Sequence, residues 1–299
     1  MTRVAVIDIG TNSTRLLVAE VDPTGRVDPL CTDLSTTRLG QGIEGGVLLP
    51  GAVDRTVRAI ESMLALARER SASITLAAAT SAVRDAANRD WFLEEVWGRT
   101  GLRVQVLEGR QEAFLSCQGV LAGFGREMAG SVIVDIGGGS TEFTWEREGR
   151  TICRSVNAGA VRMTEGGYGR REIAEVLRET VSEIKGYATG QLIGVGGTVT
   201  TLAAMDLGLE VYDRDRVHGH ALGLDRVIRL HDGLVRAGPE GRRRLTGLQP
   251  ARADIIVAGV TILLEVMAGL QAGRILVSEA DLMYGLALQA VKLSKQKQE

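Results

Sequence analysis

DIGTNST at residues 8–14 returns as DIGGGST at residues 135–141, and each copy follows an apolar run rich in β-branched residues. Such a run is typical of a buried strand, and the Gly/Ser/Thr turn after it presents main-chain N–H groups beside hydroxyls and a carboxylate. These groups together can hold phosphate and its metal ion. The alternative is a pair of Gly-rich hairpins, because another alternating strand follows each copy. The repetition favours two related half-molecules that face one polyphosphate.

Composition limits the classes of function. The chain has 299 residues, 44% of them apolar, and a net charge of −2. It can bury one large core or two ordinary ones, and its charge argues against bulk binding to nucleic acid or to an anionic membrane. No apolar run approaches the roughly 18 residues of a membrane span, and we expect no signal peptide. Three scattered cysteines, at 31, 117 and 153, lack metal-ligand spacing and fit a reducing cytoplasm.

Strand-like and helix-like segments follow each other twice along the chain. In the first half we expect strands at 4–9, 16–21, 27–37, 74–79 and 104–107, and helices at 52–71, 91–100 and 111–123. In the second half we expect strands at 132–134, 142–146, 151–156, 191–195 and 274–277, and helices at 171–188, 199–205, 253–271 and 281–291. The order predicts an α/β architecture with mixed sheets and a linker near 122–130.

The motifs in this order resemble the exopolyphosphatase / guanosine pentaphosphate phosphohydrolase family of the actin–sugar-kinase–heat-shock ATPase superfamily. The matching segments are DIGTNSTRLLVAEV (8–21), ATSAVRDAANRD (79–90), LEGRQEAFLS (107–116), VIVDIGGGSTEF (132–143) and GVGGTVTTLAA (194–204). The resemblance implies two actin-like ATPase (ribonuclease H-like) domains, with an active-site cleft between them. We expect an N-terminal domain at 1–123, joined by a C-terminal helix at 283–299, and a second domain at 124–282.

Glu112 is the candidate general base, at the position that resembles the family's catalytic glutamate. Hydrolysis of a terminal phosphate needs a carboxylate that orients and deprotonates water. From spacing alone, an acid in a first helical turn would more simply complement the helix macrodipole. Arg84 resembles the family's arginine, which would neutralise the phosphate under attack. The alternative for Arg84 is a surface ion pair with Asp85 or Asp90.

Asp8, Asp135 and Glu142 form the candidate acidic set around a divalent cation, which we expect to be Mg²⁺. Mg²⁺ needs hard oxygen ligands, and one or two carboxylates with substrate oxygens suffice. The first copy of the motif carries Arg15 where the second carries Glu142. This difference assigns more of the metal chemistry to the second copy. Either aspartate could instead hydrogen-bond its own turn.

The candidate phosphate-binding residues lie in three Gly-rich or hydroxyl-rich turns. They are Asn12 and Ser13 in the first copy, Gly137, Gly138, Gly139, Ser140 and Thr141 in the second, and Gly196, Gly197 and Thr198 before a later helix. For this last turn, phosphate binding at a helix start and close packing of small residues are equally good interpretations. His218 and His220 lack a Cys or a third His at metal spacing and are interpreted as structural or as peripheral to the substrate.

The expected activity is a Mg²⁺-dependent exopolyphosphatase that releases orthophosphate from the end of inorganic polyphosphate. Removal of the γ-phosphate from guanosine pentaphosphate uses the same residues and is the alternative. A sugar or small-molecule kinase and a non-catalytic polyphosphate sensor are more distant classes, against which Glu112 and its segment argue. A homodimer is implied only by the resemblance. One departure is Asp281-Leu282-Met283-Tyr284-Gly285, where the family pattern is Gly-Leu-Arg-x-Gly.

Overall fold

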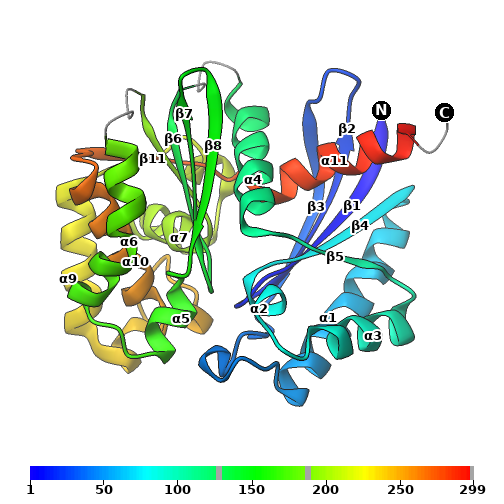
Figure 1. The fold of residues 1–299 in the computed structure, drawn as a ribbon, viewed down its shortest axis with the longest axis horizontal. Helices are drawn as coiled ribbons and strands as arrows, with labels where there is room; N and C mark the ends of the chain where they lie inside the picture. Colours follow the sequence, from blue (N-terminus) through cyan, green and yellow to red (C-terminus); the bar gives the residue numbers. More distant parts are fainter. Residues whose placement is uncertain (126–129, 186–189, 297–299) are drawn as a thin grey trace. The chain divides into compact units, whose positions relative to one another are not determined.

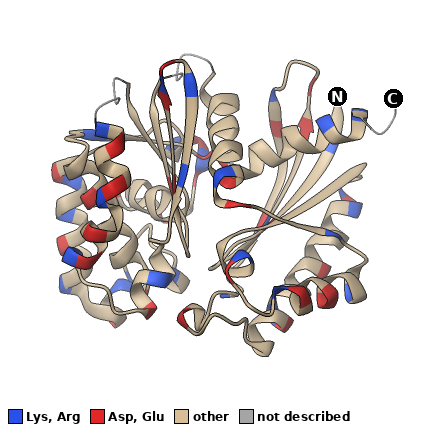
Figure 2. Ribbon diagram, in the orientation of Figure 1, with Lys and Arg blue, Asp and Glu red and all other residues tan. Residues whose placement is uncertain are grey.

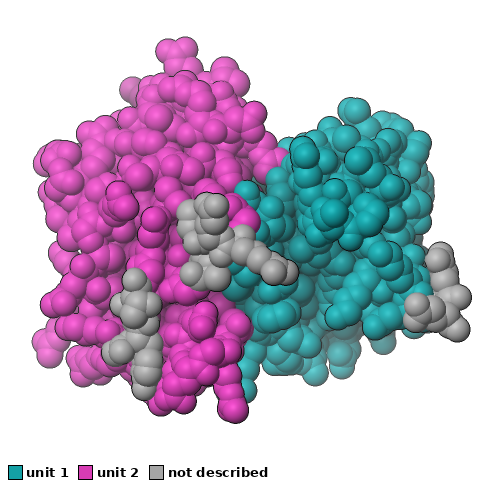
Figure 3. All heavy atoms as spheres, turned by 90° about the horizontal axis from the view of Figure 1, so that it is seen from above, with its two compact units in different colours: residues 1–123, 282–299 teal, residues 124–281 magenta. Residues whose placement is uncertain are grey.

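A computed structural model describes residues 1–125, 130–185 and 190–296. The chain forms two compact units, coloured separately in Figure 3: unit 1 contains residues 1–123 and 282–299, and unit 2 contains residues 124–281. The last helix, α11 (Leu282–Gln296), therefore belongs with the first residues of the chain. The linker expected near 122–130 includes residues 126–129, which lie outside the described residues.

Unit 1 is built on a five-stranded sheet with the strand order β3-β2-β1-β4-β5 (Figure 1). Its strands are β1 (Thr2–Ile9), β2 (Thr14–Val21), β3 (Val27–Ser35), β4 (Ile74–Ala79) and β5 (Val104–Val106). The first three form an antiparallel meander, whereas β4 runs parallel to β1 and β5 runs parallel to β4. Strands β1 and β4 consequently end at the same edge of the sheet.

Helices cover both faces of this sheet. They are α1 (Pro50–Glu69), the short α2 (Ser81–Arg84), α3 (Arg89–Thr100), α4 (Gly109–Phe124) and α11, with a 3₁₀ turn at Ile43–Gly45. Successive residues of β1 face opposite sides of the sheet. Ala5 and Ile7 lie in a core with residues of α1 and α3, whereas Val4 and Val6 lie in a second core with α11.

Helix α11 meets α4 without room for a side chain at the crossing. A Cβ added to Gly285 of α11 would lie 2.0 Å from the main-chain oxygen of Leu115 in α4. Leu115 also belongs to the core that α11 forms on the sheet. The C-terminal helix therefore closely approaches the helix that carries Glu112 at this one crossing.

Unit 2 repeats the arrangement of unit 1 with one further strand. Its sheet order is β10-β11-β9-β6-β7-β8, in which β6, β7 and β8 form the antiparallel meander and β9 and β11 run parallel to β6. The strands are β6 (Val132–Ile136), β7 (Thr141–Arg147), β8 (Arg150–Val156), β9 (Leu192–Val195), β10 (Ala221–Gly223) and β11 (Arg274–Val277). The predicted α/β class with two mixed sheets is confirmed.

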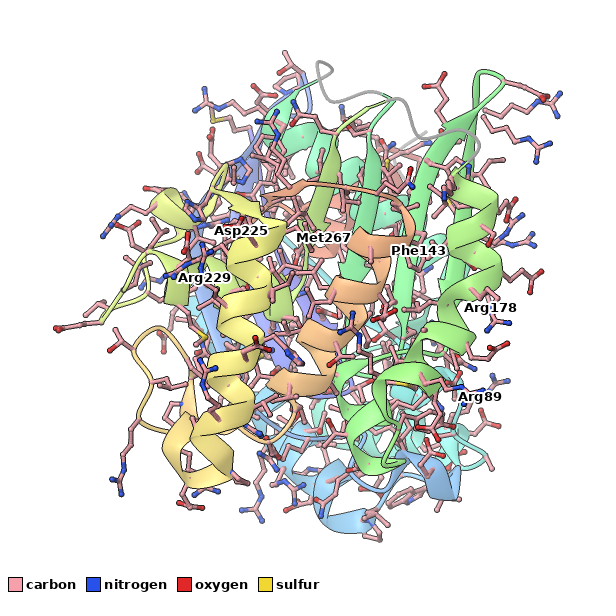
Figure 4. The ribbon with its side chains drawn as sticks, turned by 90° about the vertical axis from the view of Figure 1, so that its left-hand side faces the viewer. Arg89, Phe143, Arg178, Asp225, Arg229 and Met267 are labelled. Atoms are coloured by element: carbon pink, nitrogen blue, oxygen red, sulfur yellow. The ribbon has the colours of Figure 1, made fainter. Side chains whose placement is uncertain are left out.

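A layer of helices covers one face of the second sheet (Figure 4). The helices of this unit are α5 (Ala160–Glu165), α6 (Arg170–Lys185), α7 (Gly197–Asp206), α8 (Arg214–Val217), α9 (Leu224–Arg242) and α10 (Ile256–Gly269), with a 3₁₀ turn at Pro250–Arg252. Met267 of α10 and Phe143 of β7 lie in the same core. Because α10 packs against α5, α6, α7 and α9, it is apolar on nearly every side.

Charges of both signs are interspersed over the outer helices of unit 2, as Figure 2 shows for α6 and α9. One such pair joins Arg229 to Asp225 on α9 at 2.8 Å, and both are labelled in Figure 4. Exposed pairs of this kind contribute little to stability. None of the described helices is both long enough and apolar enough to cross a membrane.

Candidate active site

The two copies of the motif form the same turn in the two units. The N–H of Gly10 donates to the main-chain oxygen of Ser13 at 3.0 Å, and the N–H of Gly137 donates to that of Ser140 at 3.0 Å. Each turn joins the first two strands of its sheet, and both follow the carboxyl end of the central strand. In α/β sheets with parallel strands, ligands bind beyond this edge.

In unit 2 the carbonyl groups of the glycine turn all point toward α5. The oxygen of Gly137 accepts a hydrogen bond from the N–H of Ala160, at 3.0 Å, and that of Gly138 accepts from Val161, at 2.8 Å. The oxygen of Gly139 accepts from Nε of Arg162, at 2.7 Å. In a trans peptide the C=O of one residue and the N–H of the next point in opposite directions. The N–H groups of residues 138, 139 and 140 therefore point away from α5.

Close approach of α5 to the turn depends on a glycine. A Cβ added to Gly159, immediately before α5, would lie 2.4 Å from the oxygen of Gly138 and 2.5 Å from the carbonyl carbon of Gly139. The hydroxyl of Thr141 donates to the oxygen of Ala158, which fixes the end of the turn to the segment leading into α5. That bond gives the Thr141 hydroxyl a structural role.

The turn of unit 1 is held in the same way by a different segment. The oxygen of Thr11 accepts a hydrogen bond from the N–H of Gly40 at 2.8 Å, and that of Asn12 accepts from Arg38 at 2.9 Å. The N–H groups of Asn12 and Ser13 consequently point away from the segment at 38–40. The side-chain amide of Asn12 donates to the hydroxyl of Ser13 at 3.1 Å, so the two candidate phosphate ligands lie together.

The strand-end acids have different cross-strand neighbours in the two units. Asp8 of β1 lies opposite Arg15 of β2, and Nε and Nη2 of Arg15 donate to its Oδ2 at 2.9 and 2.7 Å. Asp135 of β6 lies opposite Glu142 of β7, whose Oε1 accepts a hydrogen bond from Ser155 at 2.6 Å. In the described part of the chain, no group of three or more His, Cys, Asp or Glu side chains is arranged to hold a metal. In unit 2 an acid thus lies opposite an acid, whereas in unit 1 an acid lies opposite an arginine.

Glu112 and Arg84 come from different elements and form a nearly buried ion pair. Nη1 of Arg84, at the end of α2, donates to Oε2 of Glu112 at 2.8 Å and to the main-chain oxygen of Leu107 at 3.1 Å. The side chains of Arg84 and Glu112 are 12% and 10% exposed. Nε of Arg84 also lies 3.5 Å from Oδ1 of Asp85, one of the two partners proposed for a surface ion pair. The Arg84 side chain is too buried for a purely surface role, and it belongs to the ion pair with Glu112.

The turn at residues 196–198 lies beside Asp135. Gly196 adopts φ 88° and ψ 163°, which only glycine adopts readily, and a Cβ there would lie 2.8 Å from Oδ1 of Asp135. A Cβ on Gly197 would lie 2.1 Å from Nη1 of Arg252, so this guanidinium lies against the start of α7. The side chain of Thr198 packs against Gly259 of α10 instead. The Thr198 side chain thus has a packing role, and phosphate binding by the turn at 196–198 stays a prediction.

Three comparisons with known proteins agree on the family. The family model described as "Ppx/GppA phosphatase family" matches residues 17–293. The chain belongs to the Ppx/GppA phosphatase family. The resemblance given by the sequence motifs is thereby confirmed.

Among individual Ppx/GppA relatives, the chain is 32% identical to Exopolyphosphatase 2 of Mycobacterium tuberculosis, over 96% of this chain and 98% of that protein. It is 31% identical to a bifunctional 3-dehydroquinate synthase/phosphatase of Fusobacterium nucleatum, over 96% of this chain. The chain spans 46% of that protein's length. A crystal structure of an exopolyphosphatase from Cytophaga hutchinsonii has a TM-score of 0.88 and 27% identity, covering 97% of this chain and 98% of the other.

Several residues of this Ppx/GppA site do not stand out in the sequence. Arg162 and Gly159 position the second turn, Gly40 positions the first, and Arg252 lies against Gly197. For Gly159, its position directly before a helix is the sequence feature that could have indicated a close backbone contact. The departure at 281–285 has a structural explanation, since Met283 lies in the core that α11 forms on unit 1. An apolar core contact stands where the family pattern has arginine.

Proposed function

We propose that this Ppx/GppA protein is an exopolyphosphatase, which removes the terminal phosphate of inorganic polyphosphate with water. The observation that carries the proposal is the pair formed by Glu112 and Arg84 at 2.8 Å. A buried carboxylate hydrogen-bonded to a guanidinium supplies a proton acceptor beside a cation, which hydrolysis of a phosphoanhydride requires. The names of relatives at about 30% identity that cover most of the chain support the same activity.

A divalent cation, which we propose to be Mg²⁺, fits the acids of unit 2. Glu142 is only 2% exposed and lies opposite Asp135 on the neighbouring strand. Like charges at directly opposed positions repel each other, and a hard cation would remove the repulsion. Asp135 and Glu142 would hold the ion, whereas Arg15 already balances the charge of Asp8. When bound, such an ion neutralises charge on phosphate oxygens.

In the proposed reaction, the turns with their outward N–H groups bind and orient the phosphate chain. Glu112 accepts a proton from water as the water oxygen forms a bond to the terminal phosphorus. The bond from that phosphorus to its bridging oxygen breaks, and its electron pair stays with the shortened chain. Arg84 balances the negative charge on the phosphate under attack. The products are orthophosphate and a polyphosphate shorter by one unit.

Guanosine pentaphosphate is the alternative substrate, because its terminal phosphoanhydride would meet the same residues. Whether the turns of both units bind one substrate in a shared cleft stays a prediction, as does a homodimer. We also propose that the protein acts in the cytoplasm, where the three scattered cysteines would stay reduced.

The deciding experiment measures orthophosphate release from polyphosphates of defined length, from guanosine pentaphosphate and from ATP, each with and without Mg²⁺. We expect Mg²⁺-dependent release that is faster from polyphosphate than from ATP. Glu112→Gln, purified alongside, controls for contaminating phosphatases. Equal or faster turnover of ATP, with transfer to an added sugar, would replace the proposal with a kinase. Faster turnover of guanosine pentaphosphate would make that compound the substrate.

A further inference from the structure

Arg162 differs from the other groups that hold the glycine turn of unit 2, because it is a charged side chain. It lies in the first turn of α5, and its Nε donates to the oxygen of Gly139 at 2.7 Å. The oxygens of Gly137 and Gly138 accept from main-chain N–H groups of α5. In unit 1 the turn oxygens of Thr11 and Asn12 likewise accept from main-chain N–H groups.

The bond to Gly139 acts on one peptide unit from its carbonyl side. The same peptide carries the N–H of Ser140 on its opposite side. A cation hydrogen-bonded to the carbonyl draws electron density through the peptide and makes its N–H a stronger donor. The bond also stops this peptide from flipping, which glycines at 137–139 would otherwise allow at little steric cost.

We propose that Arg162 is a positioning residue for phosphate binding, which orients and polarises the Gly139–Ser140 peptide so that its N–H donates to a phosphate oxygen. The inference rests on the proposed function for the class of substrate, and it adds a residue for which the sequence predicted no role. Because Arg162 acts from behind the turn, it needs no contact with substrate or with Glu112.

The test compares three variants. Arg162→Met keeps the unbranched stem and removes the charge, and Arg162→Lys keeps the charge. Arg242→Met is the matched control, since Nε of Arg242 also donates to a main-chain oxygen at 2.7 Å, that of Leu234, within α9. The measurements are KM and kcat with tripolyphosphate, the dissociation constant of inorganic phosphate, and the thermal midpoint.

We expect Arg162→Met to raise KM and the phosphate dissociation constant about tenfold, as for loss of a hydrogen bond with a charged partner, while kcat changes less than about threefold. Arg162→Lys should recover affinity to within about threefold of wild type, and it is the fallback if Arg162→Met does not fold. Arg242→Met should leave both constants unchanged. If Arg162→Met binds phosphate like wild type, or if both Met variants weaken binding equally, Arg162 has no such role.

The outcomes separate this inference from the proposed function. A wild-type protein that binds phosphate without hydrolysing polyphosphate, with weaker binding in Arg162→Met, refutes the activity and keeps the role of Arg162. A wild-type protein that hydrolyses polyphosphate with an unaffected Arg162→Met refutes only the role. A wild-type protein that neither binds phosphate nor hydrolyses polyphosphate refutes both.

Discussion

Asp135 and Glu142 lie opposite each other at the ends of two neighbouring strands, a position where unit 1 has Asp8 paired with Arg15. The same repeated fold thus holds an acid opposite an arginine in one unit and an acid opposite an acid in the other. On the proposed function, a divalent cation binds the second arrangement, where two carboxylates lie at opposed positions. The metal hypothesis therefore predicts the direction in which Mg²⁺ and substitution of these acids change the stability of the protein.

Without Mg²⁺, Asp135→Asn should be as stable as wild type or more stable, because it removes a like-charge contact of about 0.2–1 kcal/mol. Added Mg²⁺ should raise the thermal midpoint of wild type but hardly that of the variant. Loss of an outer-shell partner typically weakens metal binding by roughly 10- to 100-fold. Asp135 is a proposed direct ligand, so Asp135→Asn should raise the Mg²⁺ concentration for half-maximal activity by at least as much. Asp8→Asn should raise this concentration less. An equal gain in midpoint for wild type and Asp135→Asn would place the ion elsewhere.

Glu112→Gln should reduce kcat by about two to four powers of ten with little change in KM, since Gln can still accept the bond from Arg84 but cannot accept the water's proton. The rival role, a partner of the helix dipole, predicts a small loss of stability and near-normal turnover. Asp225→Asn is the matched control, because Asp225 lies in the first turn of α9 and is exposed. Turnover of Glu112→Gln within a few-fold of wild type would remove Glu112 as the base.

Gly285→Ala should destabilise the protein by about 1–3 kcal/mol, because the new methyl group would overlap the main-chain oxygen of Leu115. It should also reduce activity through displacement of α4. Gly98→Ala in α3 is the control: a Cβ there meets nothing within 4 Å, and alanine should stabilise that helix by up to about 1 kcal/mol. Urea denaturation measures both changes. If Gly285→Ala leaves the free energy of unfolding unchanged, α11 can move away from Leu115 without loss of stability, which contradicts the prediction.

Asp206 links stability to pH in unit 2. Burial raises the pKa of its carboxyl, but hydrogen bonds from Arg226 and from His220, the latter at 2.7 Å, outweigh burial and hold the pKa below its ordinary value. A lowered pKa in the folded state stabilises the protein above the unfolded value, and this contribution is lost as pH falls through the folded value. Asp206→Asn should therefore cost about 1–2 kcal/mol at pH 7 and progressively less below about pH 4. Thermal midpoints from pH 7 to pH 3 measure the difference; a gap that does not narrow contradicts the assignment.

The sequence predicted the two sheets well, because strand alternation and turn glycines are local signals. The strand expected at 74–79 is β4, with the same bounds. Helix α5 and strand β10 escaped prediction because six and three residues are too short to show a period. Glu112 and Arg84 were each named from the family resemblance, but their pairing had no signal in the sequence, since neither spacing nor composition brings α2 and α4 together. The carbonyl contacts of Arg162 and Gly40 depend on tertiary packing and had no sequence pattern.

The return of α11 to unit 1 also has a consequence for the order in which the protein can fold during synthesis. Unit 2 is continuous in the chain, so its core can close once residue 281 has left the ribosome. Unit 1 emerges first, yet the sheet face formed by Val4, Val6 and Leu17 lacks its covering helix until residues 282–296 follow. The nascent chain therefore carries an uncovered apolar face through more than half of its translation, when it is most open to aggregation or to capture by a chaperone.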